Sequence, residues 1–129
     1  MYEALIEQAK QARENAYTPY SGFNVGAAVR TRNGKIFQGC NVENSSYGAT
    51  ICAERVALFA AYAYGEREIE ALAIVTDTQR LCPPCGMCRQ VIIELGGDID
   101  IILANLHDEQ RVIRASDLLP EAFTHDFFA

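Results

Sequence analysis

The 129-residue sequence lacks any apolar run that approaches the roughly 20 residues of a membrane-spanning helix. Its first seven residues, MYEALIE, also lack the basic flank and apolar core of a signal peptide. Positive charge is scarce and scattered, since 11 Lys and Arg residues stand against 17 Asp and Glu, for a net charge of −6. A surface that binds nucleic acid through its phosphates needs clustered positive charge. We therefore expect a cytoplasmic protein that binds a small molecule, with no membrane segment and no nucleic-acid partner.

Internal repeats and low-complexity segments are absent too, and half of the residues are hydrophobic. The length is typical of one ordered domain, so we predict a single domain over residues 1–129. The five cysteines cannot all pair with one another, and the cytosol keeps thiols reduced. The sequence therefore argues against a disulfide framework and favours metal binding or thiol chemistry.

The first part of the chain predicts a helix followed by a hairpin. Small apolar residues recur at helical spacing over 2–15. Apolar residues then alternate over 23–31, which is typical of a strand. The Asn33-Gly34 pair suits a two-residue turn into an antiparallel strand over 36–40. The polar stretch 41–48 follows neither period and is predicted to be a loop.

The rest of the chain predicts alternating helices and strands. The predicted elements are a helix over 50–65 capped by Thr50, a strand over 72–76, a helix over 85–95 stopped by Gly96-Gly97, strands over 99–104 and 111–114, and a short helical turn over 116–120. A helix between two parallel strands is a crossover that covers one face of the sheet. The order of elements therefore predicts an α/β fold, a mixed five-stranded sheet with helices on its faces.

Three cysteines fall at the predicted N-terminal ends of two helices. Cys52 lies in the first turn of one helix, while Cys85 and Cys88 begin another with the spacing of metal ligands. The free N–H groups and positive dipole of a helix N-terminus favour thiolate over thiol. Gly86 would give the backbone freedom to bend around a metal. Together the three thiols could hold one zinc ion and leave its fourth position to water.

The C-x-x-C pair alone is equally compatible with a redox pair or with half of a structural zinc site. A structural site requires a fourth ligand, for which Cys40, Cys82, His107 and His125 are the candidates. Such cysteines are more often small apolar fillers, and the two histidines fall in predicted surface segments. A catalytic site with three protein ligands is therefore the favoured interpretation.

Charged residues beside the thiols extend the predicted site. Glu54 is two residues from Cys52 and could carry protons if the metal lies beyond the helix end, where both side chains converge. Arg55 and Arg89 lie three and four residues after Cys52 and Cys85, so each can face the thiolate of its own helix. We expect one or both arginines to donate hydrogen bonds to sulfur and offset its negative charge.

Five motifs occur in order along nearly the whole chain. They are Tyr17-x-Pro19-Tyr20-Ser21-x-Phe23-x-Val25-Gly26-Ala27-Ala28, Gly39-Cys40-Asn41-Val42-Glu43-Asn44, Cys52-Ala53-Glu54-Arg55, Pro84-Cys85-Gly86-x-Cys88-Arg89-Gln90 and Leu118-Leu119-Pro120-x-x-Phe123. Together they make the sequence resemble the small zinc-dependent cytidine deaminases that act on free nucleosides. The resemblance implies the fold of that family and the hydrolysis of cytidine and 2′-deoxycytidine to uridine, 2′-deoxyuridine and ammonia in pyrimidine salvage.

The resemblance also implies a mechanism. Cys52, Cys85 and Cys88 would hold one Zn²⁺ per subunit, which lowers the pKa of bound water to about 7 and so supplies hydroxide. Glu54 would take the water proton, protonate N3 of the cytosine and help carry a proton to the departing amine. Pro83 departs from the family, where Ser is common. If the backbone carbonyl at position 83 contacts the leaving ammonia, proline keeps that contact. Any role of the serine side-chain hydroxyl would be lost.

Substrate contacts follow from the same resemblance. It implies substrate-binding roles for Phe23, Asn41, Glu43, Ala53, Tyr47 and Phe123. Phe23 would lie against the pyrimidine ring, and Asn41 and Glu43 would bind ribose hydroxyls. Relatives form homotetramers with sites shared between subunits, and Tyr47 and Phe123 match positions that reach a neighbouring subunit's site.

Two other functions stay open. One is deamination of a different cytosine compound, such as a nucleoside antibiotic or an RNA base. The Asn41-x-Glu43-Asn44 motif favours a free nucleoside, and the negative net charge disfavours RNA. The other is a noncatalytic zinc or thiol-redox protein.

Overall fold

The computed structural model describes residues 1–128, which form helices and strands along the whole chain. The elements are α1 (Glu3–Arg13), β1 (Val25–Thr31), β2 (Ile36–Cys40), the 3₁₀ helix η1 (Tyr47–Ala49), α2 (Ala53–Ala63), β3 (Ile69–Thr76), α3 (Gly86–Gly96), β4 (Asp100–Asn105), β5 (Gln110–Arg114), α4 (Ala115–Leu118) and the 3₁₀ helix η2 (His125–Phe128). Within residues 1–128, no helix is long and apolar enough to cross a bilayer.

The strands form one mixed sheet in the order β2-β1-β3-β4-β5. β3 and β4 are parallel, and α3 is the crossover between them. The other neighbouring strands are antiparallel. The predicted α/β fold with a mixed five-stranded sheet and a helical crossover is confirmed.

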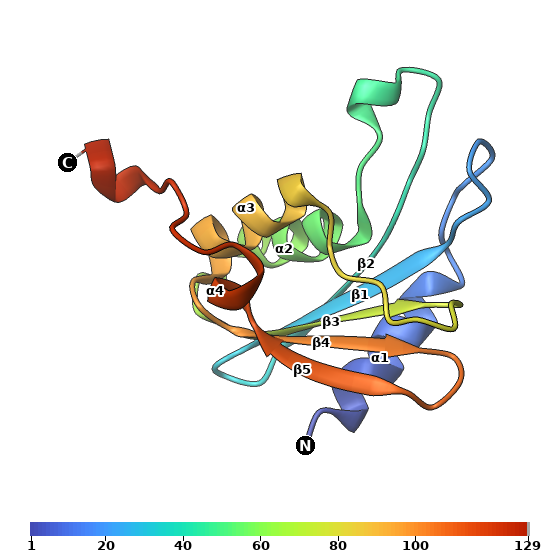
Figure 1. Cartoon of the computed structure of the whole chain (residues 1–129), viewed down its shortest axis with the longest axis horizontal. Helices are drawn as coiled ribbons and strands as arrows, with labels where there is room; N and C mark the ends of the chain where they lie inside the picture. Colours follow the sequence, from blue (N-terminus) through green and yellow to red (C-terminus); the bar gives the residue numbers. More distant parts are fainter. Residues whose placement is uncertain (129) are drawn as a thin grey trace.

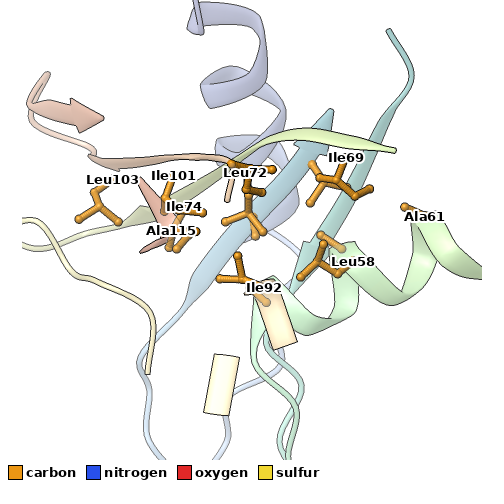
Figure 2. Close-up of a cluster of buried hydrophobic side chains, with 14 residues drawn as sticks. Leu58, Ala61, Ile69, Leu72, Ile74, Ile92, Ile101, Leu103 and Ala115 are labelled. Carbon is orange, nitrogen blue, oxygen red and sulfur yellow. The ribbon is translucent and has the colours of Figure 1, made fainter. Parts of the chain in front are cut away.

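Helices cover both faces of the sheet, with α2 and α3 on one face and α1 on the other (Figure 1). Under α2 and α3, Leu58 and Ile92 pack against Leu72 and other apolar residues of the strands (Figure 2). Under α1, Leu5 packs in a second cluster with Ala28 and other residues of β1, β3 and β4. Each fully buried aliphatic side chain contributes about 1.5–3 kcal/mol, so the two clusters hold the helices in place.

Gly39 sets the position of α2 on the sheet. A Cβ atom at Gly39 would lie 2.5 Å from Ala53 O and 2.5 Å from Ala57 N, which is too close for any other residue. The first turn of α2 therefore rests directly on the β2 backbone. Because Cys52 immediately precedes α2, this contact also fixes where the Cys52 thiol stands.

The turn of the β1–β2 hairpin consists of the three residues 32–34 between the hydrogen-bonded Thr31 and Lys35, so the predicted two-residue turn is wrong. Gly34 has a φ of 90°, but Asn33 does not share this positive φ, which a type I′ turn requires at both central positions. The Thr31 N–H donates to Lys35 O at 2.8 Å and closes the longer loop. The Thr31 hydroxyl also accepts from the Lys35 N–H at 3.0 Å and donates to Asn33 Oδ1, which favours this turn.

Two predicted element ends are also wrong. Phe23 lies in the loop before β1 because the Asn41 side chain, instead of a neighbouring strand, bonds the backbone around it. Cys52, not Thr50, is the N-terminal cap of α2. The reason is that Ile51 pairs with Val42 through two backbone hydrogen bonds of 3.1 Å, which keeps the chain extended up to Cys52.

Candidate active site

The three cysteines predicted to bind metal meet at one place. Cys52 caps α2, Cys85 caps α3, and Cys88 lies in the first turn of α3. The Sγ atoms of Cys52 and Cys85 are 3.8 Å apart, and those of Cys85 and Cys88 are 3.4 Å apart. A tetrahedral zinc ion with sulfur ligands at about 2.3 Å separates them by about 3.8 Å. The three thiols therefore fit one zinc ion, and thiolates are donors that zinc prefers.

The thiol protons are lost unequally. Hydrogen bonds from the other thiols, that of Cys88 first, and from Arg55 lower the pKa of Cys52 to about 5. The pKa of Cys88 is raised, first by its bond to Cys52 and then by burial. Cys52 therefore ionises in preference to Cys88, and its thiolate gives the cluster a negative charge that attracts a cation.

Arg55 and Arg89 make different hydrogen bonds, and only Arg55 contacts a thiol. Arg55 Nη2 donates to Cys52 Sγ at 3.6 Å and to Thr50 O at 3.4 Å, as expected for a residue that offsets thiolate charge. Arg89 donates instead to two backbone carbonyls, Pro84 O at 2.8 Å and Leu118 O at 2.9 Å. Its expected bond to sulfur is not made within residues 1–128. Arg89 fixes the chain that enters α3.

Glu54 is buried in the first turn of α2, with 5% of its surface exposed. Burial raises its pKa to about 7, and the nearby Cys52 thiolate acts in the same direction. A carboxyl group that titrates near neutrality can both accept and donate a proton. Glu54 also lines the same cavity as Cys52 and Cys85, so the convergence expected at the helix end is present.

The cavity beside the thiols has a volume of about 280 Å³. Glu54 and the thiols of Cys52 and Cys85 line one part of it, and the Ala53 residue between them also contributes to the wall. This volume is close to the lower limit of small-ligand pockets, about 300 Å³, so the cavity suits a small molecule. A Cβ atom at Gly86 would meet nothing within 4 Å, and Gly86 has no positive φ. The expected need for the conformational freedom of glycine at this position is therefore not found.

Asn41 and Glu43 line this cavity, yet each already has partners within the chain. Asn41 Nδ2 donates to Phe23 O at 2.7 Å, and its Oδ1 accepts from the Val25 N–H at 2.9 Å. Glu43 Oε1 accepts from the Tyr20 N–H at 3.0 Å and from the Ser21 N–H at 3.1 Å. A carboxylate has about four acceptor positions and an amide nitrogen two protons, so both side chains keep capacity for a ligand.

Comparison with known proteins agrees with this geometry. Residues 1–104 match the family model of the cytidine and deoxycytidylate deaminase zinc-binding region. The chain belongs to this family. It is 53% identical over 123 residues to a cytidine deaminase of Halalkalibacterium halodurans, covering 95% of this chain and 93% of the relative. The crystal structure of cytidine deaminase from Burkholderia pseudomallei matches with a TM-score of 0.92 and 55% identity, covering 95% of this chain and 99% of that one.

A second relative extends the agreement. A cytidine deaminase of Sporosarcina psychrophila is 48% identical over 125 residues, which is 96% of this chain and 92% of the relative. Cys52, Glu54, Cys85 and Cys88 all lie within the region that matches the deaminase family. Zinc as the cofactor of this family therefore agrees with the three-thiol cluster.

Two residues with implied substrate roles in the deaminase family do not line the cavity of their own chain. Tyr47 is 71% exposed in η1, with its ring edge-on to Tyr20 at 5.6 Å. Phe123 is 60% exposed in the arm after α4 and stacks on Phe127 at 5.6 Å. Figure 1 shows that the η1 segment and the C-terminal arm both extend away from the sheet.

The sequence did not reveal several residues in the cavity wall. Ser21, Thr50, Ile51 and Ile74 line it although no spacing rule pointed to them. Ser21 stands in the first deaminase motif, which was the only available signal. Cys82, interpreted as an apolar filler, also lines the cavity, and burial raises the pKa of its thiol.

Proposed function

We infer that this chain hydrolyses cytidine and 2′-deoxycytidine to uridine, 2′-deoxyuridine and ammonia, as a cytoplasmic enzyme of pyrimidine salvage carried by one domain over residues 1–129. The observation that carries this inference is the cluster of three thiols, two of which, Cys52 and Cys85, line one small cavity together with the buried Glu54. A three-thiolate site leaves one tetrahedral position free, as catalytic zinc sites do. Membership of the cytidine deaminase family gives the reaction.

The proposed mechanism assigns proton transfer to Glu54. A zinc ion held by Cys52, Cys85 and Cys88 would supply a Lewis acid that lowers the pKa of water to about 7. Glu54 accepts a proton from the water that adds to C4 and delivers it to N3 of the ring. It then helps move the remaining proton of that water from the C4 hydroxyl to the amino group, the C4–N bond breaks as the C4 carbonyl forms, and ammonia leaves. A carboxyl group with a pKa of about 7 suits both directions of transfer.

The substrate would lie with its base near the thiols and its ribose near Asn41 and Glu43. Both residues line the cavity and keep hydrogen-bonding capacity for hydroxyl groups. Phe23 is 43% exposed and borders the same cavity, which supports the proposed contact of its ring with the pyrimidine. Ala53 and Pro83 complete the wall close to the reacting atoms.

We further propose that the enzyme is a homotetramer whose sites are shared between subunits. Tyr47 and Phe123 support this, because both are exposed aromatic residues on segments that extend from the sheet. Each belongs to its own group of exposed aromatic rings, Tyr47 with Tyr20 and Phe123 with Phe127, and exposed aromatic groups are typical of protein interfaces. Light scattering on the purified protein would give a mass near four times 14.3 kDa, and a monomer mass would contradict the proposal.

The decisive experiment follows ultraviolet absorbance and ammonia release after cytidine is added to the zinc-loaded protein. Parallel reactions contain 2′-deoxycytidine, cytosine, a cytosine nucleotide and a cytosine-containing RNA. Turnover of the two nucleosides above the other compounds would support the proposal. Preferential turnover of another compound would reassign the substrate. The absence of all turnover would favour the noncatalytic zinc or thiol-redox function.

A further inference from the structure

The loop before β1 holds Phe23 by hydrogen bonds to its backbone. The Phe23 N–H donates to Ser21 Oγ at 3.1 Å, and the Phe23 carbonyl accepts from Asn41 Nδ2 at 2.7 Å. Because the ring itself is 43% exposed, core packing alone does not fix it. The backbone N–H and carbonyl groups of Phe23 are instead held by the side chains of Ser21 and Asn41, which both line the cavity.

The Ser21 hydroxyl also reaches Glu43. It donates to Glu43 Oε2, while the backbone N–H groups of Tyr20 and Ser21 donate to Oε1. A serine hydroxyl has one proton to donate and can accept as well, so this group uses both functions. Gly22, with a φ of 69°, lets the chain turn so that Ser21 and Phe23 approach one another.

We propose that Ser21 is a positioning residue for the nucleoside: its hydroxyl fixes the Glu43 carboxylate and the Phe23 backbone relative to one another. The two residues come from different segments, one before β1 and one after β2. Ser21 bonds to both and itself lines the cavity. The inference rests on the proposed function, since it concerns binding of the same substrate, and it adds a residue whose proton is committed to Glu43.

The test compares Ser21→Ala and Ser21→Thr with the parent enzyme, all loaded with zinc. Loss of a hydrogen bond to a charged group should raise KM for cytidine on the order of tenfold in Ser21→Ala, with kcat changed by less than about twofold. Binding of uridine, measured by calorimetry, should weaken by a similar factor. Ser21→Thr keeps the hydroxyl and should restore both values. Ser45→Ala is the matched control, because Ser45 is exposed and its hydroxyl has no hydrogen bond within residues 1–128.

The outcomes separate this proposal from the proposed function. If the parent enzyme does not turn over cytidine, the proposed function fails. If the parent is active and Ser21→Ala keeps the parental KM and uridine affinity, Ser21 does not position the nucleoside. A threonine variant that fails to rescue an impaired alanine variant would equally overturn the role of the hydroxyl. Should Ser21→Ala not fold, Ser21→Cys replaces it, since a thiol is a weaker donor of similar shape.

Discussion

The Sγ atoms of Cys52 and Cys85 lie 3.8 Å apart, although the residues are 33 positions apart in the chain. Each thiol stands at the N-terminal end of its own helix, and the two helices lie on the same face of the sheet. The metal-binding geometry therefore depends on the packing of α2 and α3. No short segment of the chain could form it alone.

The cluster predicts one zinc ion per chain. Metal analysis should find about one zinc in the parent protein and far less in Cys52→Ala, Cys85→Ala and Cys88→Ala, since each removes one of three thiolates. Cys40→Ala and Cys82→Ala are matched controls and should keep a full zinc content, because neither thiol belongs to the cluster. Full activity in a zinc-free protein would contradict the assignment.

Replacement of Glu54 by glutamine should stop proton transfer and leave the metal in place. We expect kcat to fall by about 10²–10⁴-fold, the usual contribution of a positioned acid–base group. Zinc content and melting temperature should stay near the parental values, as checked by metal analysis and calorimetry. Glu7→Gln, at an exposed position on α1, is the control and should be fully active. Substantial turnover by the Glu54→Gln protein would remove this residue from the mechanism.

Stability should depend on the ionisation of Glu43. The Ser21 hydroxyl and the backbone N–H groups of residues 20 and 21 hold the pKa of Glu43 below its ordinary value of about 4.3. Its contribution to the free energy of unfolding is therefore complete above that value and is lost as the pH falls through the lower folded-state pKa.

Urea unfolding between neutral pH and pH 3 can measure this effect. The difference in unfolding free energy between the parent and Glu43→Gln should be constant above about pH 5 and should shrink in acid. The same difference for Glu68→Gln, an exposed position, should not follow this course. A Glu43→Gln difference that stays constant down to pH 3 would be evidence against the anchoring role of the carboxylate.

A methyl group at position 39 should disturb both stability and the metal site. Gly39→Ala forces the first turn of α2 away from β2, and such overpacking typically costs about 1–3 kcal/mol. Because Cys52 caps α2, zinc affinity should weaken as well. Gly48→Ala is the control, since a Cβ there meets nothing within 4 Å. Equal stability of the two variants in chemical unfolding would show that the close approach is unimportant.

Shared sites predict complementation between two defective chains. Phe123→Ala keeps its own thiols and Glu54, whereas Glu54→Gln keeps Phe123 for a neighbour. If Phe123 serves the site of another subunit, mixing and reassembling the two proteins should restore part of the activity that each lacks. Activity of the mixture equal to the sum of the separate proteins would argue that Phe123 acts only within its own chain.

Local patterns predicted much of the fold and the metal site. Apolar periodicity located the helices and most strands, and cysteine spacing at helix starts located the metal ligands. These features depend on short stretches of sequence. The three-residue turn before Lys35 was missed because the Thr31 hydroxyl, which no Asn-Gly rule includes, makes hydrogen bonds across the loop.

Residues whose partners lie far along the chain were harder to predict. Spacing placed Arg89 near the thiolate of Cys85, but its guanidinium binds Leu118 O, 29 residues away. Alternation likewise extended the first strand to Phe23, where the Asn41 side chain in fact replaces strand pairing. In both cases a contact that only the folded chain brings together decided the outcome.

Because Cys52 and Cys85 lie far apart along the chain, a metal bound to both would also stabilise the fold. An ion that bridges them would close a loop of 33 residues, as a covalent cross-link would. The lower chain entropy of the unfolded state would then stabilise the fold by about 3–4 kcal/mol. Unlike a disulfide, this cross-link can be removed by a chelator and works in a reducing compartment. The free energy of unfolding would then rise with the logarithm of the free zinc concentration, so a fall in zinc supply would shorten the lifetime of the folded enzyme.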